Sequence, residues 1–80
     1  MEKKIGIIAI MVNDRNQAER INNLLAEFGE IILSRQGLHI ESEKVNVISL
    51  IVNSDTNTIN SLTGKIGRIK DIKVRTLQIN

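Results

Sequence analysis

The chain has 80 residues, enough for one domain but too few for two independent cores. It contains no cysteine, which excludes disulfides and thiolate metal sites, and its only aromatic residue is Phe28, so the core must be built from Ile, Leu and Val. The formal net charge of +2 is too small to indicate a particular partner. A domain of this size is marginally stable alone, which favours association of several subunits.

The first predicted element is a strand over residues 5–12, an apolar run bounded by Lys4 before it and Asn13 after it. A run this short and this rich in β-branched residues indicates a strand covered on both faces. It is too short to span a membrane, and no small-residue cleavage site follows it. We therefore expect a soluble cytoplasmic protein that retains this strand and has no membrane partner.

A helix is predicted next, because apolar residues recur at spacings of three and four from Ala18 to Phe28. Asp14, followed by Gln17, fits an N-cap with its capping-box partner. Gly29 stands where the end of a helix needs a positive φ.

Two strands joined by a polar turn at residues 41–44 follow this helix. The second strand runs from Ile31 to Ile40, and Gly37 inside it indicates a bulge or a close backbone approach. The third strand covers residues 45–52 and is again apolar on both faces.

A second helix and a fourth strand end the chain. Capping residues at 53–56 begin the helix, which ends near Gly67. Gly64 in its middle is unfavourable for a helix, which suggests that the helix packs closely on the sheet there. A turn at residues 70–71 leads to the strand over residues 72–79.

The element order is strand, helix, strand, strand, helix, strand, with short connections. This order predicts one α+β domain over residues 1–80 with the ferredoxin-like βαββαβ fold, a four-stranded antiparallel sheet with two helices on one face. Right-handed crossovers place the first and third strands at the centre of the sheet. These are the two strands that are apolar on both faces, so the pattern and the topology agree.

The second face of such a sheet is left open. The bulkier alternate residues of the two central strands are assigned to the helix side: Ile8, Ile10, Val12, Ile48, Leu50 and Val52. The remaining set is assigned to the open face: Ile5, Ile7, Ala9, Met11, Val47 and Ile51. A monomer would expose this set as one apolar patch. We therefore expect a homo-oligomer, dimer or tetramer, whose interface these residues form.

Residues typical of catalysis or metal binding are sparse. There is no nucleophile motif, phosphate loop, dinucleotide fingerprint or clear carboxylate pair, so no catalytic residue and no cofactor is predicted, and we expect no enzyme. His39 is the only histidine. It is either an exposed strand-end residue or, with Glu41 or Glu43 and symmetry copies, part of a shared metal site. We predict no tight metal site in the chain itself.

The best candidate for binding a small molecule is the loop Asn13, Asp14 and Arg15. It joins the end of a central strand to the start of a helix, where free amides can bind an anionic group. The alternative is that Asp14 only caps the helix and that Arg15 is solvated.

The segment after position 64 contains five basic residues, which lie between Lys65 and Arg75, and one acidic residue. This segment is either a surface for nucleic acid or a solvated helix end followed by an edge strand that charge protects from aggregation.

Several stretches together resemble the iron-only hydrogenase system regulators, a family of small single ACT-like domains similar in fold to the C-terminal domain of the nickel-responsive regulator. The matching stretches cover nearly the whole chain: Ile5-Gly6-Ile7-Ile8, Asp14-Arg15 with Ala18 and Asn22, Arg35 with Gly37, Ile48-Ser49-Leu50-Ile51-Val52, and Leu62-Thr63-Gly64-Lys65-Ile66-Gly67-Arg68-Ile69. The last stretch is the most specific. The nickel site of that regulator needs several histidines and a cysteine, so it does not carry over.

The resemblance implies a non-enzymatic regulatory or ligand-sensing ACT-like domain that acts as a homo-oligomer in a hydrogenase system, with a transcriptional role. It also implies that a small effector binds at the loop over residues 13–15, across a subunit interface. The alternative function, which comes from the residues alone, is a nucleic-acid-binding protein that uses the basic C-terminal surface.

Overall fold

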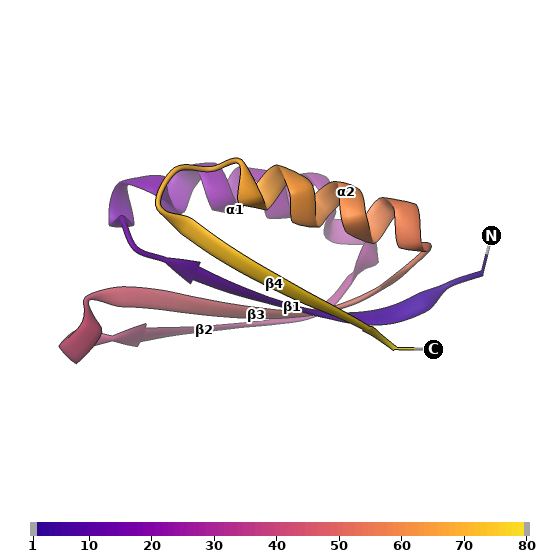
Figure 1. Ribbon diagram of the computed structural model, residues 1–80, viewed down its shortest axis with the longest axis horizontal. Helices are drawn as coiled ribbons and strands as arrows, with labels where there is room; N and C mark the ends of the chain where they lie inside the picture. Colours follow the sequence, from indigo (N-terminus) through magenta and orange to yellow (C-terminus); the bar gives the residue numbers. More distant parts are fainter. Residues whose placement is uncertain (1, 80) are drawn as a thin grey trace.

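The computed structural model describes residues 2–79, and its main elements follow the predicted order (Figure 1). They are β1 (Lys4–Val12), α1 (Ala18–Glu27), β2 (Ile32–Ile40), β3 (Val45–Ser54), α2 (Thr56–Gly67) and β4 (Ile72–Ile79). Short 3-10 turns lie at Arg15–Gln17, Gly29–Ile31 and Glu41–Glu43. Within the described range, neither helix is long and apolar enough to cross a bilayer.

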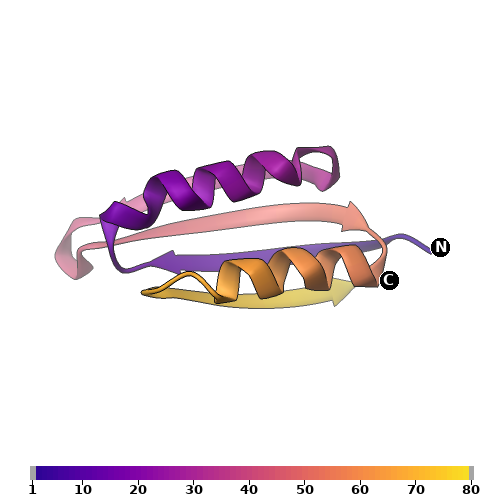
Figure 2. The same ribbon diagram turned by 90° about the horizontal axis from the view of Figure 1, so that it is seen from above.

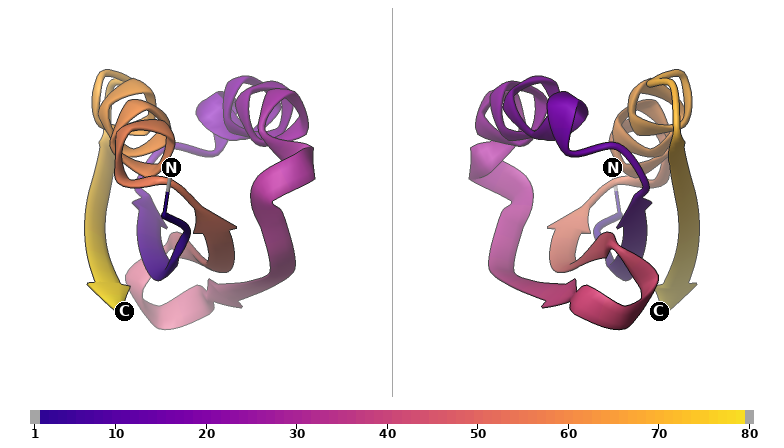
Figure 3. Two further views of the ribbon diagram at one scale, coloured as in Figure 1. Left: turned by 90° about the vertical axis from the view of Figure 1, so that its right-hand side faces the viewer. Right: turned by 90° about the vertical axis from the view of Figure 1, so that its left-hand side faces the viewer.

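The four strands form one antiparallel sheet in the order β2-β3-β1-β4. Both helices cover the same face, with α1 above β2 and α2 above β4 (Figure 2). Viewed end-on, the opposite face of the sheet is left uncovered by both helices (Figure 3). The predicted α+β, ferredoxin-like βαββαβ arrangement is confirmed, and β1 and β3 are the central strands.

Every second side chain of β1 and β3 points toward the helices, and these side chains form the core beneath them. Ile8 pairs with Leu50, and neither side chain has any exposed surface. The six residues assigned to the helix side are all buried: Ile8, Ile10, Val12, Ile48, Leu50 and Val52. The helices close this core with Ile21 and Leu25 from α1 and with Ile59, Leu62 and Ile66 from α2.

An aspartate precedes each helix, but only one of the two caps it. The Asp55 carboxylate caps α2, where it accepts hydrogen bonds from the Thr58 hydroxyl at 2.7 Å and from the Thr58 backbone N–H at 3.0 Å. These hydrogen bonds hold the pKa of Asp55 below its usual value, and the bond from the Thr58 hydroxyl has the largest effect. Asp14 instead accepts from the Asn16 N–H at 2.9 Å and caps a 3-10 turn, so α1 itself begins only at Ala18.

The predicted roles of two glycines are wrong. The bulge in β2 falls between Ile32 and Ser34, and not at Gly37. Gly37 lies on an edge strand with open space around it, so nothing there requires a glycine. Gly29 has no positive φ, because the chain continues from α1 into a 3-10 turn instead of ending in a left-handed residue.

The suggestion that Gly64 brings α2 close to the sheet is also wrong. A Cβ built at Gly64 would meet no atom within 4 Å, because this residue faces solvent. The close approach occurs at Gly6 in β1. A Cβ there would lie 3.1 Å from Cγ2 of Val52 and 3.6 Å from Cδ1 of Ile59.

Candidate functional site

A hollow of about 690 Å³ opens at the carboxyl end of β1. Antiparallel pairing of β1 with β3 brings the loop after β1 beside the turn between β2 and β3. We call this the β1-end hollow, and its lining residues are Val12, Asn13, Asp14, Arg15, His39, Glu41, Lys44 and Asn46. The three residues of the predicted binding loop therefore lie together in one cavity wall.

Several backbone amides of this loop are already bonded within the protein. The N–H of Asn13 donates to the carbonyl of Asp71 at 2.9 Å. The N–H groups of Asn16 and Gln17 donate to the side chain and the carbonyl of Asp14, each at 2.9 Å. These three amides are not directed at a ligand, so recognition in the hollow depends mainly on side chains.

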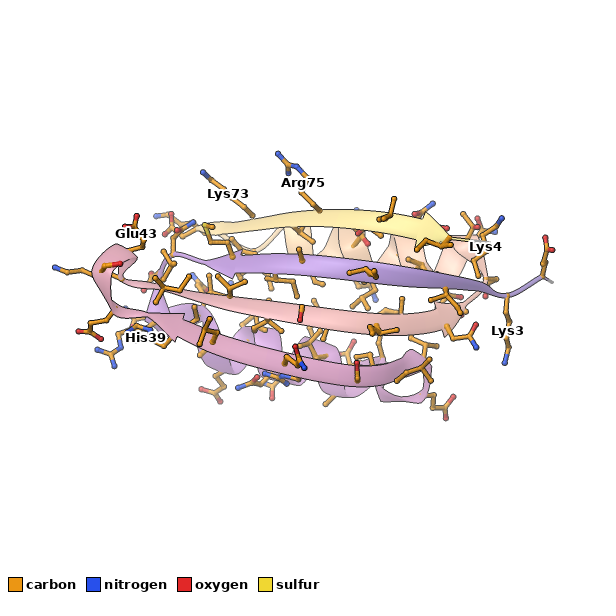
Figure 4. The ribbon with its side chains drawn as sticks, turned by 90° about the horizontal axis from the view of Figure 1, so that it is seen from below. Lys3, Lys4, His39, Glu43, Lys73 and Arg75 are labelled. Carbon is orange, nitrogen blue, oxygen red and sulfur yellow. The ribbon has the colours of Figure 1, made fainter. Side chains whose placement is uncertain are left out.

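His39 is held from both sides on the wall of the β1-end hollow. Its Nδ1 lies 2.8 Å from Oδ1 of Asn46, the residue opposite it on β3. Its Nε2 lies 3.0 Å from Oε2 of Glu41. The histidine is thus exposed at the end of β2, as predicted (Figure 4). Its ring orientation is fixed by the two neighbouring side chains.

The cluster of His39, Glu41, Lys44 and Asn46 beside the loop was missed by the sequence analysis. The signal that could have found it is the strand order. If β1 and β3 are antiparallel neighbours, the turn before β3 must lie beside the loop after β1. The predicted topology therefore already contained this juxtaposition.

The β1-end hollow carries charges of both signs. Arg15 and Lys44 supply cations, and Asp14 and Glu41 supply carboxylates. Such a set can hold a small polar molecule through charge-assisted hydrogen bonds. Within residues 2–79, no three or more His, Asp or Glu side chains are grouped so that they could hold a metal ion.

The uncovered face of the sheet is a second candidate surface. We call it the open face, and its outward-facing residues, strand by strand, are Ser34, Gln36 and Leu38 on β2, Val47, Ser49, Ile51 and Asn53 on β3, Ile5, Ile7, Ala9 and Met11 on β1, and Lys73, Arg75, Leu77 and Ile79 on β4. All six residues that were assigned to this face by sequence lie on it.

Large apolar side chains on the open face are widely exposed. The exposed fraction is 48% for Ile5, 40% for Ile7, 42% for Ile51 and 60% for Leu77. Soluble monomers seldom expose contiguous apolar patches of this kind, and larger ones mark interaction sites.

The basic residues of the C-terminal segment do not share one face. Lys73 and Arg75 flank the open face along β4 (Figure 4). Lys65 belongs to the helical layer, where its Nζ lies 5.4 Å from the centroid of the Phe28 ring, a cation–π distance. Arg68 follows on the same helical layer, at the end of α2. The predicted basic surface is therefore divided between the two sides of the molecule.

Comparison with known proteins places the chain in one family. Residues 4–76 match the family model described as "TM1266-like: Iron-only hydrogenase system regulator, putative". The structure of the uncharacterized protein TM1266 from Thermotoga maritima is similar at 39% sequence identity and a TM-score of 0.92, over 99% of this chain and 100% of that chain. No curated protein matches the chain significantly.

A more distant likeness concerns the fold alone. The divalent ion tolerance protein CutA1 from Ehrlichia chaffeensis is 19% identical, with a TM-score of 0.50, over 96% of this chain and 82% of that chain. At this identity the similarity supports the four-stranded α+β architecture and does not extend to a function.

Proposed function

The chain belongs to the TM1266-like family of iron-only hydrogenase system regulators, and from this premise we propose that it is a non-enzymatic, ACT-like regulatory domain that senses a small polar ligand as a homo-oligomer. The family supplies the regulatory role. Ligand sensing and oligomer formation are the parts of the proposal that depend on the geometry of the chain.

The observation that carries the sensing role is the β1-end hollow. It joins the loop of Asn13, Asp14 and Arg15 to His39 at the end of β2 and to Glu41 in the turn that follows. A molecule bound there would contact two segments at once and would hold them together. Binding would therefore be coupled to the order of this end of the sheet.

The chemistry of the hollow favours a ligand with charged groups of both signs. Arg15 and Lys44 complement an anionic group, and Glu41 complements a cationic one. These side chains are exposed, so each ion pair is weak alone and a small ligand needs several of them at once. Free amino acids and small polar anions are the classes to test first.

Homo-oligomer formation is supported by the open face. About two-fifths of Ile7 and of Ile51 remains exposed in the single chain, so completing the burial of each contributes roughly 0.5–1 kcal/mol, and several such residues together can drive association. A second, identical copy offers the same apolar residues and needs no other partner.

The test is a thermal-shift screen of amino acids, nucleotides and metal ions, followed by NMR titration of the best compound. A ligand at 100 times its dissociation constant adds roughly 2.7 kcal/mol to the free energy of unfolding. We expect the amide signals of residues 13–15 and of His39 to move first. Arg15→Ala should weaken binding, whereas Arg20→Ala on the exposed side of α1 should not. Amide shifts confined to the opposite end of the sheet would exclude the β1-end hollow.

Binding of nucleic acid remains the alternative, although no single surface in the structure favours it. It would show as a salt-dependent shift of labelled DNA or RNA that is lost when Arg68 and Lys73 are neutralised.

A further inference from the structure

The open face carries a hollow of its own. It measures about 270 Å³ and is lined by Ala9 and Met11 of β1, Val47 of β3, and Lys73 and Arg75 of β4. The cause is Ala9, the one small side chain among the open-face residues of β1. We call it the Ala9 hollow. Its apolar floor is bordered on the β4 side by the cationic residues Lys73 and Arg75, and Nη1 of Arg75 donates to the carbonyl of Val74 at 2.9 Å.

A protruding side chain stands at the same level on the opposite edge of the sheet. Leu38 of β2 has an exposed fraction of 65%. The register joins it in one row across the strands to Val47, Met11 and Lys73, which line one side of the hollow, while Ala9 and Arg75 lie in the next row, that of Gln36. The projection therefore has the height of the Met11 side of the hollow but lies on the opposite half of the open face.

Two copies can exploit this arrangement if they stack face to face. A two-fold axis that runs along the strands, midway between β1 and β3, places β2 of each copy over β4 of the other and leaves the height along the strands unchanged. Leu38 of each copy then lies over Lys73 of the other, at the edge of the Ala9 hollow, from where its side chain can enter the hollow. The contact occurs twice, as two-fold symmetry requires. The strands of the two sheets remain nearly aligned, which is a common mode of sheet packing.

The other face-to-face arrangement brings like charges together. A two-fold axis across the strands reverses the height, so that Leu38 would lie over the Ser34 end of the second copy's β2. The axis would then pass through the row of Gln36, Ser49, Ala9 and Arg75, and Arg75 of each copy would lie over Arg75 of the other. Like charges that face each other across an interface are unfavourable, although Leu77 could enter the hollow in this arrangement.

Charge is also compatible with the axis along the strands. Lys73 and Arg75 would lie over the β2 edge of the second copy, where the open-face residues Ser34 and Gln36 are uncharged. Beyond Leu38, at the end of β2 that leads into the turn, His39 faces the helix side and the next charged residue is the acidic Glu41. No like charges are therefore brought together along this edge.

The area is sufficient for a stable dimer. Strand residues rise about 3.3 Å and neighbouring strands lie about 4.8 Å apart, so four strands of eight to ten residues present roughly 500–600 Å² of flat surface. Side-chain relief raises the accessible area above that value, toward the roughly 800 Å² per copy of a standard interface.

We propose that the open face binds a second copy of this chain about a two-fold axis along the strands, with Leu38 of each copy inserted into the Ala9 hollow of the other. The proposal rests on the homo-oligomer formation proposed above and specifies its geometry.

Reciprocal size changes test it. Leu38→Ala removes the projection, and Ala9→Leu fills the hollow and collides with the incoming Leu38. Each change is made twice in a dimer, so the dissociation constant should rise about a hundredfold for Leu38→Ala and at least about tenfold for Ala9→Leu. Ala26→Leu adds the same side chain on exposed α1 and should leave the dissociation constant unchanged. Circular dichroism establishes that each variant is folded.

A mixture of the two variants gives the decisive result. In a heterodimer, one contact pairs the shortened residue 38 with the filled hollow and the other pairs native Leu38 with native Ala9. Native mass spectrometry should therefore show heterodimers that form more tightly than either variant alone, and the Ala9→Leu, Leu38→Ala double variant should regain self-association.

The outcomes separate the geometry from the association itself. If the wild-type chain dimerises and both variants dimerise equally well, or if both are weakened and mixing does not restore binding, this docking geometry is wrong while self-association stands. If the wild-type chain is monomeric at micromolar concentration, homo-oligomer formation itself is wrong.

Discussion

Gly6 in β1 and Gly64 in α2 occupy opposite environments. A Cβ at Gly6 would press on Val52, which is fully buried and cannot move aside, whereas a Cβ at Gly64 would enter open space. Gly6→Ala should therefore lower the free energy of unfolding by about 1 kcal/mol through overpacking. Gly64→Ala should raise it by about 0.5–1 kcal/mol, since alanine loses less conformational entropy in a helix.

Urea unfolding of the two glycine variants beside the wild-type chain measures both effects. The pair controls for the alanine side chain, which is the same in each. A loss of stability in Gly64→Ala would mean that α2 approaches another segment of the chain at this position.

A second prediction at the residue scale concerns acid. The folded-state pKa of Asp55 lies below its reference value of 3.8, because Thr58 donates two hydrogen bonds to the carboxylate. The contribution to stability is therefore complete at pH values above 3.8 and is lost as the pH falls through the lower, folded-state pKa. Asp55→Asn keeps an oxygen that can accept from Thr58 but cannot ionise.

Urea unfolding at several pH values between about 2.5 and 6 isolates this residue, because all other carboxyl groups are common to both proteins. The wild-type chain should lose more stability than Asp55→Asn across the acid end of that range. Parallel curves would show that the Asp55–Thr58 hydrogen bonds do not persist in solution.

At the scale of the elements, hydrophobic periodicity predicts all four strands and both helices, because each buries one stripe or one face. The bulge in β2 could not be predicted, since it depends on which residue of β3 lies opposite each residue of an edge strand. Gly37 suggested the wrong position for the bulge, because a glycine can also occur where neither the backbone conformation nor the packing requires one. The role assigned to Gly64 failed for the same reason.

The edge strand β2 is joined to α1 by a side-chain hydrogen bond in which Arg35 donates to Oδ1 of Asn22. Most of β2 is exposed, so this bond is one of the few attachments of the strand outside the sheet. Arg35→Ala should speed hydrogen exchange of the β2 amides up to about fivefold, since such a bond contributes about 1 kcal/mol. Arg68→Ala at the end of α2 is the matched control. Equal exchange in all three proteins would show that α1 does not hold β2 in place.

At the scale of the whole molecule, the sequence was sufficient to assign the two faces of the sheet. Alternate residues of β1 and β3 face opposite sides of the sheet, and the helices bury the set that was assigned to them. Only one side of the β1-end hollow, the loop at residues 13–15, was predicted from the sequence. The loop at residues 13–15 follows from capping, whereas the contribution of His39 and Asn46 arises from contacts between segments distant in sequence. Side-chain contacts of that kind need the strand register, which periodicity alone does not fix.

The open face gives the last prediction. Ile7 and Ile51 are a cross-strand pair at its centre, and each is about two-fifths exposed in the single chain. Ile7→Glu or Ile51→Glu should leave the fold intact but place two charges in the dimer interface. Each change removes roughly 0.5–1 kcal/mol of apolar burial per copy, because only two-fifths of the isoleucine is left to bury, and adds the larger cost of desolvating a carboxylate. Self-association should weaken at least about a hundredfold. Reversing the charge at Glu19 or Glu27, both exposed on α1, should have no effect. Sedimentation velocity at micromolar concentration distinguishes these cases, and glutamate variants that sediment like the wild-type chain would show that association, if it occurs, uses another surface.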